Sequence, residues 1–190
     1  MQQQIPARRA RRHRLHRGRA GFTLIELLTA VTVLVFGIGA LVTIVATTAA
    51  ANRLNHETAL ALSAAQGAIE RMRGEEFSEV FARYNADEDD DPDGKATAPG
   101  AGFAVPGLAA QPGDADGLPG EIVLPADGPE LWEDEDLLLF GLPRDLNLDG
   151  FVDGLDHSGD YRVLPVLVRV RWLGRTGPRQ LELMTSLADL

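Results

Sequence analysis

The 190 residues suffice for one folded domain, and 45% apolar and 24% charged residues are ordinary for such a domain. There is no cysteine, which excludes disulfide bonds. The seven charged residues at positions 1–21 are all arginine. The chain after Gly21 has 11 basic and 28 acidic residues and hence a net charge of about −17, which argues against direct nucleic-acid binding.

An apolar segment follows the arginines. No charged residue lies between Leu27 and Asn52, and the run from Leu24 to Val45 is long enough to span a bilayer as a helix. Arginines before the run and acids after it predict a single-pass inner-membrane protein with a cytoplasmic N-terminus and a periplasmic or extracellular head. A cleaved secretory signal is the alternative, although its apolar region is normally shorter.

The segment Gly21-Phe22-Thr23-Leu24-Ile25-Glu26-Leu27-Leu28 opens this run. Together with the basic leader, it resembles the prepilin recognition motif of type IV pilins and type II secretion pseudopilins. The resemblance implies that residues 1–21 are a leader, that prepilin peptidase cuts between Gly21 and Phe22, and that Phe22 becomes N-methylated.

Glu26 is the one acid inside the apolar run. A carboxylate near a membrane segment is unfavourable by at least a few kcal/mol, so such residues are usually functional. Cleavage would create a cation, the Phe22 α-amine, which Glu26 of a neighbouring subunit could neutralise. The alternative is that Glu26 only extends to the lipid headgroups.

Helical spacing continues beyond the membrane segment, so one helix is expected from Phe22 to Arg73, with a second at 75–84. The resemblance divides the chain after the leader into the assembly half of the long helix, residues 22–51, and a head, residues 52–190, which is helical over 52–84. One face of the head's helix should be buried, through Leu54, Thr58, Ala61, Ala65, Ala68, Ile69 and Met72.

The rest of the head is predicted from turn residues and alternation. Residues 85–129 are rich in Asp, Gly and Pro and should be mostly loop, with a strand at 121–124. In residues 161–187, side chains alternate between two faces on both sides of a turn at 174–178. This pattern predicts an antiparallel hairpin, with a bulge or edge at Pro165. The predicted fold is α+β and type IV pilin-like: a long N-terminal helix on a small antiparallel sheet.

Residues 145–156 resemble the calcium loop of EF-hand and, more closely, dockerin modules. The spacing places Gly150 at the sharp turn and Asp at the twelfth position. A lone Ca²⁺ site is therefore expected, and its ligands would be Asp145, Asn147, Asp149, the Phe151 carbonyl, Asp153 and Asp156. A solvated acidic turn is the alternative, and a second cation at 87–93 or at Asp114 and Asp116 stays open.

No catalytic constellation is evident, and no enzymatic activity is expected; His56 and His157 are expected to be solvated. The resemblance implies a minor pilin or pseudopilin of a type IV pilus or type II secretion pseudopilus. Its partners would be prepilin peptidase, other pilin subunits and an inner-membrane assembly platform. A filament-tip binding module and an exported protein that never assembles are the alternatives.

Overall fold

The structure, a computed structural model, describes residues 21–135 and 137–189; the predicted leader lies outside this part except for Gly21. The chain forms two compact units, Met1–Thr48 and Ala49–Leu190. Helix α1 (Leu24–Gly74) contributes to both, which confirms the single long helix predicted from the sequence. Every described residue of the first unit is exposed.

In the second unit, one face of α1 is buried. The buried positions are Ala61, Ala65, Ala68, Ile69 and Met72, which follow the predicted spacing of three and four residues. Most are alanines, whose small side chains let other elements pack close to the helix axis. Helix α2 (Phe77–Tyr84) follows after two residues and buries Val80, Phe81 and Tyr84, as its helical pattern predicts.

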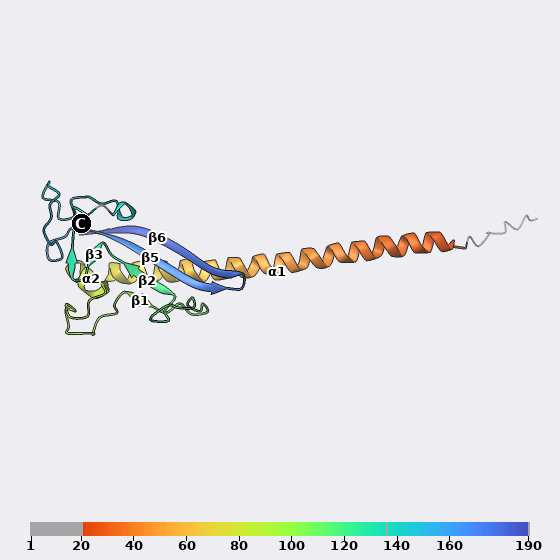
Figure 1. Cartoon of the computed structure of the whole chain (residues 1–190), viewed down its shortest axis with the longest axis horizontal. Helices are drawn as coiled ribbons and strands as arrows, with labels where there is room; N and C mark the ends of the chain where they lie inside the picture. The colour runs from red at the N-terminus through yellow and green to blue at the C-terminus, as the bar shows by residue number, and fades with distance from the viewer. Residues whose placement is uncertain (1–20, 136, 190) are drawn as a thin grey trace, which may run out of the picture. The chain divides into compact units, whose positions relative to one another are not determined.

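A four-stranded antiparallel sheet covers this face of α1, in the order β1-β2-β5-β6. Its strands are β1 (Gly102–Phe103), β2 (Gly120–Val123), β5 (Val163–Gly174) and β6 (Gly177–Ala188). Figure 1 shows β5 and β6 running beside the C-terminal part of α1. Strands β3 (Ala126–Asp127) and β4 (Glu130–Leu131) form a separate pair, and a single 3-10 turn, η1, spans Leu138–Phe140.

The β5–β6 hairpin has the predicted pattern. Val166, Val168, Val170 and Trp172 are buried on the face toward the core, and the register runs unbroken from Val163↔Ala188 to Gly174↔Gly177. Of the bulge or edge expected at Pro165, the bulge is wrong and the edge is confirmed. Strand β2 ends at Val123, opposite Leu167, so β2 offers no partner to the backbone of β5 at Pro165, where the N–H is missing.

Tyr161 ties α2 to the start of the hairpin. Its hydroxyl donates to the Phe77 carbonyl and accepts the Phe81 N–H at 3.1 Å, while its ring lies 5.0 Å from that of Phe77. These contacts join residues about 80 positions apart in the chain. The architecture is therefore the predicted α+β arrangement of a long apolar helix on a small antiparallel sheet.

Candidate functional site

The first candidate site is the start of α1. Gly21 and Phe22 precede the helix, and Thr23 caps it: the Thr23 hydroxyl accepts the Glu26 N–H at 3.3 Å. Glu26 lies in the first turn, where a carboxylate interacts favourably with the helix dipole. The sequence analysis missed the cap, although Thr-x-x-Glu before an apolar run is its usual signal.

The apolar segment of α1 has a mean hydropathy of 2.5 over 18 residues, and none of that window is buried. The helix is thus long and apolar enough to cross a membrane. Within the first unit, Thr29, Thr32, Thr43 and Thr47 each donate their hydroxyl to a carbonyl three or four residues earlier in α1. These four hydroxyl groups therefore carry no unpaired donor into an apolar surrounding.

The second candidate site is the loop at 145–156. Its first half forms a set of tight turns built on side-chain oxygens. Asp145 accepts the N–H groups of Leu148 and Gly150 at 2.6 and 2.8 Å, and Asn147 accepts that of Asp149 at 3.0 Å. Gly150 has φ of +96°, as the predicted sharp turn requires. Three predicted ligand residues therefore belong to one compact turn.

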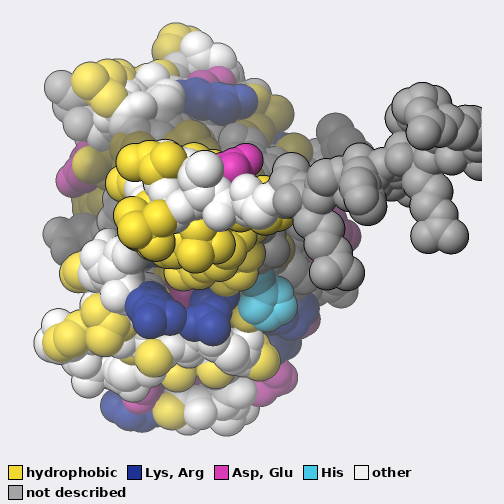
Figure 2. Space-filling view, turned by 90° about the vertical axis from the view of Figure 1, so that its right-hand side faces the viewer, with side chains coloured by type: hydrophobic (Ala, Val, Ile, Leu, Met, Phe, Trp, Pro, Cys, Tyr) yellow, Lys and Arg dark blue, Asp and Glu magenta, His cyan; other side chains and the backbone are white. Residues whose placement is uncertain are grey.

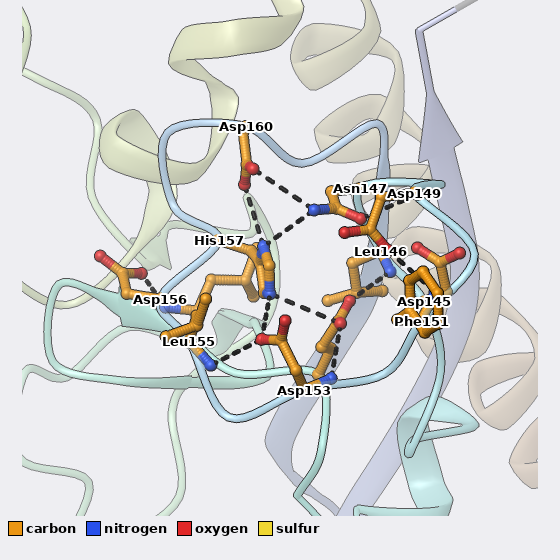
Figure 3. Close-up of polar contacts among 12 residues, drawn as sticks. Asp145, Leu146, Asn147, Asp149, Phe151, Asp153, Leu155, Asp156, His157 and Asp160 are labelled. Atoms are coloured by element: carbon orange, nitrogen blue, oxygen red, sulfur yellow. Dashed lines mark hydrogen bonds and ion pairs between the residues drawn. The ribbon is translucent and has the colours of Figure 1, made fainter.

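The second half of the loop has other partners. The Asp156 carboxylate accepts the N–H groups of Leu131 and Ser158 at 3.0 and 2.9 Å, which outweigh its burial and lower its pKa. The Asp153 carboxylate accepts the Leu155 N–H and lies 3.3 Å from His157 Nε2. Figure 3 shows Asp156 on the opposite side of His157 from Asp145. Asp156 therefore lies apart from the turn that holds Asp145, Asn147 and Asp149.

Glu133, which the sequence analysis missed, joins the two halves of the loop. It comes from the segment after β4, and only 1% of it is exposed. One carboxylate oxygen accepts the Leu146 N–H at 2.7 Å, and the other accepts the Asp153 N–H at 3.0 Å. The backbone of the loop is therefore held at both ends by one buried acid.

His157 is buried, so the expectation of a solvated histidine is wrong for it; His56 is exposed as expected. The Nδ1 of His157 lies 3.0 Å from a carboxylate oxygen of Asp160, and its Nε2 lies 3.4 Å from one of Glu133. Burial opposes protonation, but the Asp160 hydrogen bond and the nearby carboxylates outweigh it and raise the His157 pKa. One ligand atom each from Glu133, Asp153 and His157 lies within 4.8 Å of the others.

The other acidic segments also have partners. In the run at 87–93, Asp89 pairs with Lys95 at 2.6 Å and Asp93 pairs with Arg83 at 3.0 Å. Asp90 accepts from the Asn85 amide at 2.6 Å. Two of the six acids of this run therefore have a cationic partner within the described part of the head.

Comparison with known proteins gives one match. The family model described as a prokaryotic N-terminal methylation motif matches residues 16–49. No curated protein matches the chain, and no solved structure does. The matched segment contains the Gly21–Phe22 junction, Glu26 and the apolar part of α1, and it supports a type IV pilin-like protein.

Proposed function

We propose that this chain is a minor pilin or pseudopilin, a structural subunit of a type IV pilus or a type II secretion pseudopilus. The observation that carries the proposal is the methylation motif at residues 16–49, placed on a helix whose apolar start is wholly exposed and whose second part packs on a sheet. The role is structural, not catalytic. Prepilin peptidase would cut after Gly21 and methylate Phe22.

Glu26 is the assembly residue in this proposal. It is exposed in the first turn of α1, four residues after the amine that cleavage would create. Pairing Glu26 of one subunit with the Phe22 amine of the next would neutralise both charges inside an apolar helix bundle. An unpaired carboxylate there would be unfavourable by several kcal/mol, so the pairing favours the filament over the separate subunit.

Replacement of Glu26 tests assembly. Glu26→Ala should leave membrane insertion and cleavage intact but lower the amount of the protein in sheared filaments, as compared with Glu70→Ala, which removes an exposed acid later in α1. Normal incorporation of Glu26→Ala would contradict the proposed role. A chain that is cleaved but never enters filaments would instead favour an exported protein that does not assemble.

We also propose that the loop at 145–156 binds one Ca²⁺. Asp145, Asn147 and Asp149 already offer oxygen atoms from one turn, and the hard oxygen donors of this segment suit calcium. Phe151 would contribute its carbonyl and Asp153 its carboxylate. Asp156 would join only by giving up its bonds to Leu131 and Ser158. The ion would stiffen a head that has no disulfide bonds.

Thermal unfolding with and without the ion tests this site. At a Ca²⁺ concentration about 100-fold above Kd, binding adds roughly 2.7 kcal/mol to the stability of the head, so the melting temperature should rise by several degrees over that in chelator. Asp145→Ala should abolish the difference, and Glu130→Ala, an exposed acid of β4, should keep it. Equal melting temperatures for the unmodified chain would exclude the site.

A further inference from the structure

One end of the second unit carries most of its uncompensated positive charge. The turn Arg175–Thr176 joins β5 and β6 there, and a Cβ at Gly174 would lie 3.0 Å from Glu57 Oε2 on α1. Trp172 Nε1 donates to the same carboxylate at 3.2 Å. The hairpin tip therefore rests against the turn of α1 that carries Arg53 and His56.

These residues form a basic collar, which we define as Arg53, His56, Arg175 and Arg179. Among the described residues, no carboxylate oxygen lies within 4.0 Å of the three arginines, whereas six of the other eight lysines and arginines have such a partner; Arg71 and Arg144 do not. Figure 2 views this end and shows basic side chains beside a histidine. The collar therefore differs from the remainder of an acidic head.

The sequence around the collar has few acids. The two segments that carry the collar, 52–57 and 174–181, contain one acid, Glu57, although the chain after Gly21 carries 28. Glu57 already accepts the Trp172 indole N–H. Positive charge is thus concentrated at one end, against a strongly negative total.

Two features of the collar suit an anion. A pocket of about 420 Å³ is lined by Asn52, Arg53, His56, Glu57, Leu60 and Gly107. The guanidinium groups of Arg53 and Arg175 are exposed and have no carboxylate partner among the described residues, so their N–H donors are suited to phosphate oxygens.

The collar is joined covalently to the exposed apolar unit, so the anions nearest to it are those of the membrane that this unit would enter. Arg53 follows Thr48, the last residue of the exposed apolar unit, by five residues of the same helix, or about 7.5 Å of helix rise. A bilayer around that unit would place its headgroups within reach of Arg53. We propose that the collar binds the phosphate groups of anionic phospholipids and holds the head on the membrane before assembly. This inference rests on the proposed membrane-anchored state.

The magnitude follows from the charges. Each basic side chain close to an anionic leaflet favours binding by about fivefold, so removal of three arginines should shift the docking equilibrium roughly a hundredfold. The effect should weaken in concentrated salt, because the Debye length falls to about 3 Å at 1 M. Binding through apolar contacts would not weaken in concentrated salt, because salt does not screen them.

A single thiol can report the docking, since the chain has no cysteine. The full chain with Thr176→Cys carries a dye at the hairpin turn and is reconstituted into vesicles that contain a lipid with a nitroxide quencher on its headgroup. Vesicles of phosphatidylcholine alone are compared with vesicles of equal parts phosphatidylcholine and phosphatidylglycerol. Flotation first confirms insertion, and a chain that fails to insert speaks against the proposed function, not the collar.

Stronger quenching in the phosphatidylglycerol vesicles, lost in high salt and in Arg53→Gln/Arg175→Gln/Arg179→Gln, is the expected result. The matched control, Arg73→Gln/Arg144→Gln/Arg162→Gln, removes the same charge from exposed positions outside the collar and should keep the quenching. Equal quenching in both vesicles would overturn the inference. So would equal loss in the two triple variants, because net charge, and not the collar, would then be responsible.

Discussion

Glu133 provides a direct test of how the loop at 145–156 is held. The change is Glu133→Ala, which removes the acceptor of two buried N–H groups, those of Leu146 at 2.7 Å and Asp153 at 3.0 Å. It also removes one of the carboxylates that face the buried His157 ring, at 3.4 Å. No other described side chain accepts from these two N–H groups.

The expected loss of stability in Glu133→Ala follows from these contacts. A hydrogen bond to a charged group contributes about 1.5–3 kcal/mol, and breaking a buried ion pair by removal of one partner costs about 3–5 kcal/mol. The two losses overlap because the same carboxylate makes both, so Glu133→Ala should lower the free energy of unfolding by about 4 kcal/mol. That is a large share of the roughly 5–15 kcal/mol that stabilises a typical domain.

Urea unfolding of the full chain in neutral detergent, followed by near-UV circular dichroism, measures this loss. Both tryptophans, Trp132 and Trp172, lie in the second unit and report on the head. Glu130→Ala, an exposed acid in β4, is the control and should change the stability by less than about 0.5 kcal/mol. Glu133→Gln keeps one acceptor oxygen and should fall between them. A Glu133→Ala head as stable as the control would refute the reasoning.

Three further predictions concern the packing of the head. Gly120→Ala should destabilise it by about 1–3 kcal/mol in the same urea assay, because a Cβ there would clash with the Phe103 ring; a wild-type midpoint would contradict the β1–β2 packing. Gly67→Ala, on α1, meets only Arg71 Nη1 at 3.9 Å and should stabilise by about 0.5–1 kcal/mol, and a loss of stability would show a contact that the structure lacks. Burial raises the pKa of Tyr161 to about 12 from 10.0, so the contribution of Tyr161 to stability should be constant below pH 10 and fall by roughly 2–3 kcal/mol between pH 10 and 12. Tyr161→Phe should remove that alkaline loss, and the same loss in the variant would assign it to another group.

The elements with regular spacing could be predicted from the sequence. The buried stripe of α1 depends on a period that local sequence reveals, and it is confirmed. The alternation of β5 is confirmed from Val168 to Trp172, whereas residues 163–167 are buried on both faces. Pro165 shows the limit of this reasoning. The sequence leaves a bulge and an edge as alternatives there, and only the end of β2 at Val123 decides for the edge.

The site could be predicted only in part, because its partners are distant in sequence. The turn at Asp145, Asn147 and Asp149 is local, and its spacing identified it. Glu133 lies 13 residues before Leu146 and 20 before Asp153, and no spacing rule joins them. One signal was present: Leu131 and Glu133 are two residues apart in an extended segment, so they share a face and hence a buried environment.

The N-terminus of the mature protein tests the central claim most directly. The chain, expressed with prepilin peptidase, should be recovered from the membrane and from sheared filaments, and its N-terminal peptide analysed by mass spectrometry. The account predicts a peptide that begins at Phe22 and carries one methyl group on its α-amine, and predicts that it disappears when the peptidase is absent. An N-terminus after Ala51, as cleavage of a secretory signal behind the apolar run would leave, would contradict it. So would a leader retained in the presence of the active peptidase.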